Sequence, residues 1–288
     1  MKVIDFFLMV CEQTFLFYPV VLSLYISYRL LKLTDLSADG VYVLGGAVFA
    51  KTLPFAGPLG ATCIAGFFGI LLGWIVALMQ RGNHIRDLIV GILVTFMLYS
   101  VNFEVLGRPN YSLLGKLTLL KAGYFSQWII GLAFINIILV AIVYLLCRSR
   151  YGLLMRAFGH NYDLLIKMGF PAERYRIIGL SMGSFLTAVT GALFAQINGF
   201  VDLNMGSGVA LIAIGALMIG HHIFRTKNEV YHPGFDLLSA FIGIFTYFAI
   251  LAFLMKFGVQ PVHLKFFIGL ILFASLRSSK GYSLGVVS

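Results

Sequence analysis

The sequence has little charge. Asp, Glu, Lys and Arg together make up 11% of its 288 residues, whereas hydrophobic residues make up 60%. A soluble domain of this size needs far more charged side chains to cover its surface, so lipid is the solvent predicted for most of the chain. In lipid every backbone N–H and C=O must be paired within the protein, which leaves helices or a closed barrel.

Short alternating apolar runs are also missing. The apolar residues fall in blocks of roughly 20, as membrane helices require, and show none of the dyad alternation over about 10 residues that is typical of barrel strands. The sequence therefore predicts an all-α, polytopic integral membrane protein with one transmembrane domain over residues 1–288. The three cysteines lie in apolar blocks without CxxC spacing and are interpreted as small buried side chains.

Motifs for catalysis and nucleotide binding are absent from the sequence. It has no G-x-x-x-x-G-K-[ST] phosphate loop, so this chain is not expected to cradle ATP phosphates by that route. Its apolar blocks hold no HExxH helix, no Ser/Lys pair and no His/Asp/Glu cluster. We therefore predict a chain that is not an enzyme, with no catalytic residue, no metal site and no cofactor of its own.

The apolar runs predict about nine membrane helices, with eight or ten as alternatives. The nine ranges are 6–28, 40–53, 58–79, 87–105, 127–147, 177–197, 209–224, 235–255 and 264–276. Three of them, 40–53, 209–224 and 264–276, are short for a full span. Tilted, half-buried or broken helices are therefore expected at these positions.

Basic residues predict the orientation. The segment 148–176 carries six Lys and Arg residues against Asp163 and Glu173, so it should be cytoplasmic. Because successive spans cross the membrane in alternate directions, this assignment places 14 of the 21 Lys and Arg residues on the cytoplasmic side. The N-terminus is then outside and the C-terminus inside. An eight-span chain with a re-entrant 40–53 would move Arg81 and Arg86 outside, which favours nine. The net charge of +10 is interpreted as cytoplasmic loops facing anionic lipid, not as a nucleic-acid surface.

The longest predicted cytoplasmic loop contains a short amphipathic pattern. Asn161 suits the N-cap of a helix, Gly169 suits the residue after its C-cap, and Pro171 follows. The apolar side of this pattern holds Leu164, Leu165 and Met168, and the polar side holds Asp163 and Lys167. Two interpretations remain open: an interfacial helix that joins two spans, or a docking element for a cytoplasmic partner.

A longer pattern surrounds this loop. It comprises Arg156-Ala157-Phe158-Gly159-His160-Asn161, then Met168-Gly169-Phe170, then a helix with Gly179, Ser181, Gly183 and Gly191-Ala192-Leu193. The pattern resembles the R-A-x-G-x-N…G-[IVF] block of ABC importer permeases of the ribose and branched-chain amino acid type. Upstream segments, among them Glu12-Gln13, Asp35–Gly40, Leu98–Asn102 and Gly107–Asn110, are similar to a subgroup described as tryptophan/tyrosine permeases. The resemblance covers residues from about 10 to 225, and departs from the pattern at Thr14 and Pro19.

The resemblance implies the membrane-spanning subunit of an importer in the cell inner membrane, moving an amino acid or related small solute. Its implied partners are a separate ATPase that binds ATP, an extracytoplasmic solute-binding protein, and a second permease copy. The residues implied to couple the chain to the ATPase are Arg156, Ala157, Gly159, Asn161, Leu164, Met168 and Gly169. The outer loops 106–126 and 198–208 are expected to receive the binding protein. The alternative is an ion-coupled secondary transporter or channel.

Polar residues inside the predicted spans add further hypotheses. Glu12 and Asn102 are candidates for the substrate pathway, or alternatively hydrated or hydrogen-bonded residues near the outer interface. Pro19 should kink the first span, or its freed carbonyl should be satisfied by a neighbour. Asp39 is expected to cap the short helix that starts at Gly40. The predicted topology places Asp39-Gly40-Val41 and the similar Ser207-Gly208-Val209 on opposite sides of the membrane, although two identities are few.

Overall fold

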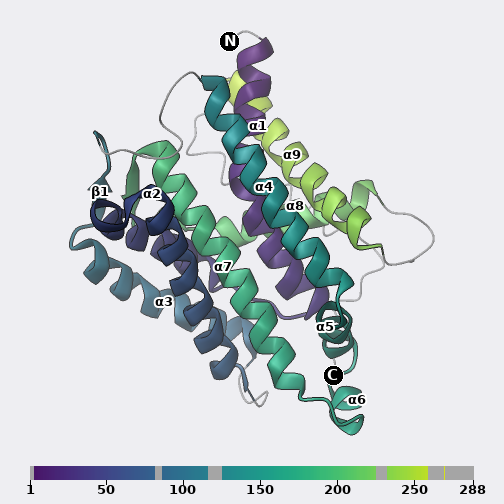
Figure 1. Ribbon diagram of the computed structural model, residues 1–288. Helices are drawn as coiled ribbons and strands as arrows, with labels where there is room; N and C mark the ends of the chain where they lie inside the picture. Colours follow the sequence, from purple (N-terminus) through teal and green to yellow (C-terminus); the bar gives the residue numbers. More distant parts are fainter. Residues whose placement is uncertain (1–2, 82–85, 116–124, 225–231, 259–268, 270–288) are drawn as a thin grey trace.

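The computed structural model describes residues 3–81, 86–115, 125–224, 232–258 and 269. Within these residues it is a bundle of helices, six of which are long and apolar enough to cross a membrane (Figure 1). The six are α1 (Val3–Leu24, continued by the π-helix η1, Tyr25–Leu30), α2 (Ala38–Met79), α3 (Asp87–Leu106), α4 (Phe125–Arg148), α7 (Ala172–Asn198) and α9 (Pro233–Lys256). A shorter apolar helix, α8 (Val209–Ile223), lies between α7 and α9 in sequence.

The all-α, polytopic architecture is confirmed, but nine separate spans are not. Six of the predicted ranges correspond to separate helices whose ends differ by a few residues: 6–28, 87–105, 127–147, 177–197, 209–224 and 235–255. The predicted range 264–276 lies outside the described residues, except for position 269.

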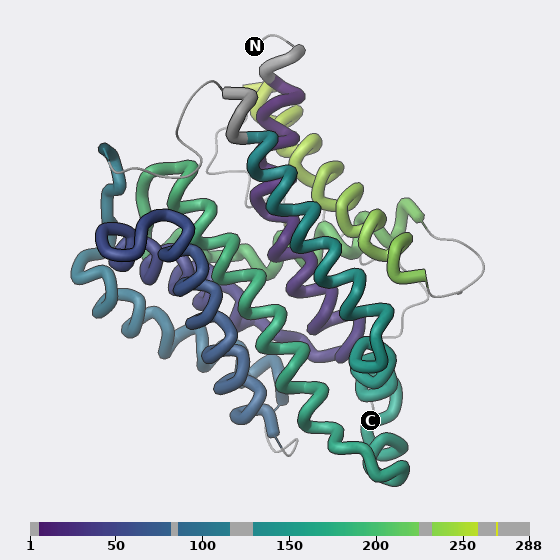
Figure 2. Tube along the Cα trace, viewed as in Figure 1, coloured from purple at the N-terminus to yellow at the C-terminus, as the bar shows by residue number. Residues whose placement is uncertain are grey.

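The predicted helices 40–53 and 58–79 are two arms of the single element α2. The arms meet at Gly57, whose φ of 67° and ψ of 174° are not helical. Pro58 disfavours a helical conformation at the residue before it, and glycine adopts a positive φ without steric cost. Figure 2 shows the chain turning sharply at this break. The proline and glycine residues therefore located the break correctly, and the two predicted helices are the two helical arms on either side of Gly57.

Both arms of α2 pack closely on α7, and glycine makes this contact possible. In the first arm, a Cβ atom at Gly45 would overlap the backbone of Ala188. In the second arm, a Cβ at Gly69 would lie 2.6 Å from the carbonyl oxygen of Ser184. Gly66, Gly69 and Gly73 thus serve packing within the chain. Because they have no side chain, the second arm of α2 can approach α7 closely.

Pro19 lies inside α1, and a neighbouring helix satisfies the carbonyl that it frees. A proline at position 19 cannot donate to the carbonyl of Phe15, four residues earlier. Instead, Asn136 Nδ2 of α4 donates a 2.8 Å hydrogen bond to this carbonyl oxygen. Asn136 is 3% exposed, so water cannot readily replace it. The expected satisfaction by a neighbour is confirmed.

Replacing Asn136 should destabilise the bundle. Asn136→Leu leaves the Phe15 carbonyl without a donor, and we expect a loss of about 1–2 kcal/mol in the free energy of unfolding. In a Pro19→Ala background the helix regains its own N–H donor, so the same substitution should cost markedly less there. Thermal unfolding of the four proteins of this double-mutant cycle measures the difference, and equal costs in both backgrounds would contradict the assignment.

The two ends of the bundle differ in structure. At one end, β1 (Asn110–Ser112) pairs antiparallel with β2 (Phe200–Asp202), and we call this the strand end. At the other end lie two short helices, α5 (Arg150–His160) and α6 (Tyr162–Lys167), between α4 and α7 (Figure 1). We call this the α5–α6 end. It carries the segment for which the sequence left two interpretations open, an interfacial helix that joins two spans or a docking element.

Candidate functional site

The segment at the α5–α6 end is built from two capped helices. Ser149 Oγ accepts a 3.4 Å hydrogen bond from the N–H of Gly152 at the start of α5. Asn161 Oδ1 accepts a 2.9 Å bond from the N–H of Leu164 at the start of α6. Gly169 follows α6 with a φ of +79°, as glycine at this position should. The helix expected between Asn161 and Gly169 is therefore present, whereas α5 was not predicted.

Three apolar side chains between Asn161 and Gly169 are exposed. Leu164, Ile166 and Met168 are 52%, 50% and 64% exposed, at the tip of the α5–α6 end. Leu165, expected on the same side as Leu164 and Met168, is instead buried at 3%. Because α6 has only six residues, Leu165 alone is buried and anchors the helix, whereas its neighbours Leu164 and Ile166 face outward. We refer to Leu164, Ile166 and Met168 as the apolar tip.

The C-terminal part of α5, at Gly159, rests on the end of η1. A Cβ atom at Gly159 would overlap the carbonyl oxygen of Leu30 and lie 2.9 Å from the carbonyl carbon of Leu31. Beside this contact, Lys32 Nζ lies 3.3 Å from His160 Nδ1. Only glycine allows this approach, so Gly159 couples the position of α5 to the end of the first transmembrane helix.

Arg176 joins the segment to two transmembrane helices. This side chain on α7 is 3% exposed, and its Nη1 donates to the carbonyl oxygen of Gln80 at the end of α2. The same nitrogen lies 3.3 Å from Glu173 Oε2, and the guanidinium stands 5.2 Å from the ring centre of Phe158 on α5. The sequence had counted Arg176 only as one of several basic residues.

Tyr162 completes this cluster. Its hydroxyl donates a 2.8 Å hydrogen bond to Glu173 Oε1, which ties the first residue of α6 to the first turn of α7. Burial, together with this hydrogen bond, raises the pKa of the Tyr162 hydroxyl, so the group remains a donor at neutral pH. We call Phe158, Tyr162, Glu173, Arg176 and the Gln80 carbonyl the α7 linkage. The α7 linkage thus connects α5 and α6 to the ends of α2 and α7.

A second site lies deeper in the bundle, where the N-termini of α2 and α8 meet. Asp39 Oδ2 accepts a 3.0 Å bond from the N–H of Gly208, and Oδ1 accepts a 2.7 Å bond from the N–H of Ala210. Asp39 thus caps α8, so the expectation that it caps its own helix at Gly40 was wrong. The expected placement of the two similar segments on opposite sides was also wrong, because 199–208 folds back against the first arm of α2.

Removing the Asp39 carboxylate should loosen α8. Asp39→Ala leaves two N–H groups at the start of α8 without their acceptor, and we expect a loss of about 1–2 kcal/mol, as for other N-caps. Asp39→Asn keeps one acceptor oxygen and should fall in between. Hydrogen exchange in the first turn of α8 measures the effect. Unchanged protection in Asp39→Ala would show that the cap does not hold this helix.

Asn102 and Glu12, the two predicted pathway residues, lie on different helices, α3 and α1. Asn102 on α3 is 1% exposed and donates a 3.1 Å bond to the carbonyl oxygen of Gly40, next to Asp39. Glu12 is half-buried on α1, a helix that packs on α4, α7, α8 and α9. The structure therefore places Asn102 beside the junction of α2 and α8.

Aromatic rings from four helices, α1, α2, α7 and α9, gather near this junction. The Phe17 ring stacks on that of Tyr42 with centroids 6.1 Å apart, and it lies 5.3 Å from Phe248. Phe194 lies 5.7 Å from Tyr42. Phe17, Phe194 and Phe248 are only half-buried. The buried hydroxyl of Tyr42 has no hydrogen-bond partner among the residues that the structure describes.

Comparison with known proteins gives one family over nearly the whole chain. Residues 6–276 match the family described as "Branched-chain amino acid transport system / permease component". An uncharacterised protein of Rickettsia prowazekii (strain Madrid E) is 48% identical over 269 residues, which cover 93% of this chain and 96% of the relative. No solved structure gives a significant match.

Two relatives with named transport roles are more distant. The tyrosine transport system permease protein of Clostridioides difficile (strain R20291) is 29% identical over 270 residues, covering 93% of this chain and 90% of the relative. The autoinducer 2 import system permease protein of Yersinia enterocolitica is 28% identical over 172 residues, covering 53% of this chain and 46% of that protein. The nearly full-length alignment with the first of these indicates a shared architecture.

Proposed function

Since the chain belongs to the family of branched-chain amino acid transport system permease components, a family of ABC transporter permeases, we propose that it is the membrane-spanning subunit of an ATP-driven importer. It lies in the cytoplasmic membrane with the α5–α6 end inside and the N-terminus outside. A separate ATPase supplies the energy, and an extracytoplasmic solute-binding protein delivers the solute. A second copy of the chain completes the translocation unit.

The observation that carries this proposal is the construction of the α5–α6 end. The apolar tip presents exposed Leu164, Ile166 and Met168 to a partner. Behind it, Gly159 rests on the end of η1, and the α7 linkage joins α5 and α6 to α2 and α7. A partner that moves the tip therefore moves three transmembrane elements: the α1–η1 helix, α2 and α7. Such closure and rocking are known ways to open a membrane site to alternate sides.

An amino acid is the proposed solute. The full-length relative that transports tyrosine supports this class. The half-buried rings of Phe17, Phe194 and Phe248 and the unpartnered Tyr42 hydroxyl offer apolar contacts and a hydrogen bond near the middle of the bundle. Asn102 and Glu12 remain proposed pathway residues. The β1–β2 pair at the strand end, within the expected outer loops, is the proposed landing surface of the binding protein.

Purification from host membranes tests the proposal. A tagged full-length chain should retain an ATPase subunit during purification. Proteoliposomes that contain this complex, with the binding protein outside, should accumulate an amino acid only when ATP is enclosed in their lumen. Uptake by the purified chain alone, driven by an ion gradient and without an ATPase, would replace the proposal with a secondary transporter.

A further inference from the structure

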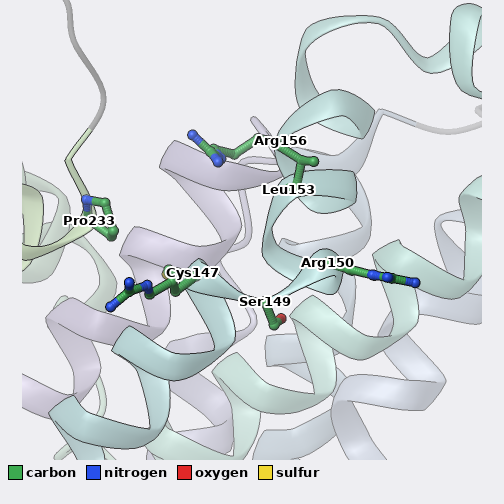
Figure 3. A pocket seen from close by; sticks show the side chains of 7 residues that line it. Cys147, Ser149, Arg150, Leu153, Arg156 and Pro233 are labelled. Atoms are coloured by element: carbon green, nitrogen blue, oxygen red, sulfur yellow. The ribbon is translucent and has the colours of Figure 1, made fainter.

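A pocket of about 290 Å³ lies where α4 ends and α5 begins. Its lining residues are Cys147, Arg148, Ser149, Arg150, Leu153, Arg156 and Pro233, the last at the start of α9. Three of these are arginines and none is acidic. Figure 3 shows Arg156 extending on the side of Pro233, whereas Arg150 extends away on the other side of Ser149. Arg148 and Arg156 both line the pocket.

The backbone adds to the positive character of the pocket. The 11-residue helix α5 begins at Arg150, next to its N-cap Ser149, so its first N–H groups and the positive end of its dipole are at the pocket. The first acidic residue along α9 is Asp236, whose carboxylate accepts a 3.3 Å bond from the hydroxyl of Tyr25. Arginine guanidinium groups match the geometry of phosphate oxygens, and helix N-termini favour anions.

An apolar stripe on α4 leads to this pocket. Exposed side chains recur on one face of the helix at Ile130, Phe134, Ile137, Ile138, Ile142 and Leu145. Leu145 is followed three residues later by Arg148, and Leu153, also exposed, lines the pocket itself. The stripe runs along a transmembrane helix, so lipid tails can lie against it. Its charged end lies on the side proposed as cytoplasmic, where anionic lipids gather and where basic pockets between helices bind their head groups.

We propose that this pocket binds the phosphate head group of an anionic phospholipid of the inner leaflet, with an acyl chain along the α4 stripe. Arg148 and Arg156 contact the phosphate, and the N-terminus of α5 supplies further N–H donors. The bound lipid holds the α4–α5 junction at the membrane surface, at the base of the helix that carries Gly159 and Phe158. Lipid binding at this pocket does not depend on what the protein transports.

The test uses the full-length protein purified in an uncharged detergent. Phosphatidylglycerol is titrated while the thermal unfolding midpoint is recorded, with phosphatidylcholine and sodium phosphate as separate arms. The wild type should be stabilised by phosphatidylglycerol far more than by either other ligand. Arg148→Gln/Arg156→Gln should weaken the apparent affinity on the order of 30-fold, since each basic residue near an anionic surface contributes roughly five-fold. Arg81→Gln, which removes an exposed arginine elsewhere, should bind as the wild type does.

Several outcomes would overturn the proposal. One is wild-type affinity for phosphatidylglycerol in the double variant, and another is equal stabilisation by sodium phosphate, which would indicate free phosphate as the ligand. Unchanged lipid affinity combined with loss of a copurifying ATPase would assign the pocket to a protein contact. Should the double variant fail to fold, each single variant, Arg148→Gln and Arg156→Gln, must still show a several-fold loss in the same titration.

Discussion

Gly159→Glu should abolish the coupling of ATP hydrolysis to transport while leaving the protein in the membrane. Even a Cβ at this position overlaps the Leu30 carbonyl oxygen and lies 3.0 Å from that of Leu31, so α5 must move away from η1. Overpacking of this kind costs about 1–3 kcal/mol, and the displaced α5 carries the apolar tip with it. We expect stimulation of the ATPase by solute-loaded binding protein to fall by about tenfold or more.

A matched control separates position from charge. Tyr151→Glu introduces the same side chain on the same helix, but Tyr151 is 54% exposed and the new group meets solvent. It should retain most of the stimulation. Membrane-inserted protein, measured on membrane fractions, should be equal for both variants. If Gly159→Glu supports normal transport at normal abundance, the contact between α5 and η1 has no part in coupling.

Arg176→Met should both destabilise the protein and uncouple it. The substitution leaves the Gln80 carbonyl and the Glu173 carboxylate without their buried cation. Removing one partner of a fully buried pair costs about 3–5 kcal/mol, but Glu173 is 23% exposed, so we expect about 2 kcal/mol here. The midpoint of thermal unfolding should fall by roughly 4–8 °C.

The neighbouring Arg174 provides the control for Arg176. It lies in the same turn of α7 but is exposed, so Arg174→Met should change the unfolding midpoint little. Arg176→Lys keeps the charge but loses the planar fork, and should be intermediate in both stability and ATPase stimulation. Equal unfolding midpoints for Arg176→Met and Arg174→Met would mean that the α7 linkage does not contribute to stability.

Features that depend on local sequence were predictable. The helix between Asn161 and Gly169 was found because an N-cap residue and a C′ glycine frame it, and both caps are present. The break in α2 was located by proline and glycine, which restrict or free the backbone at their own positions. We predicted that a neighbour would donate a hydrogen bond to the carbonyl freed by Pro19. No local pattern indicates that the donor is Asn136, which is 121 residues away from Phe15 in the sequence.

Features that depend on distant pairing were missed. Asp39 caps a helix 169 residues further along the chain, and no period or cap rule in the sequence indicates that partner. Arg176 meets a carbonyl 96 residues earlier, so composition alone presented it as one more positive charge. The helix α5 was missed because it is short and mixes apolar with basic residues, although its buried residues Gly152, Met155 and Phe158 recur every three positions. That spacing was the one available signal for it.

Cross-linking from the apolar tip tests most directly whether an ATPase acts on the chain there. A photo-reactive amino acid in place of Met168, which is 64% exposed, is activated in intact cells, and the adducts are identified by mass spectrometry. The same probe in place of exposed Leu114, at the strand end, is the reference. We predict an adduct with a nucleotide-binding subunit from position 168 and none from position 114. An adduct from position 168 with an extracytoplasmic protein would place the tip on the outer face and contradict the proposed mechanism.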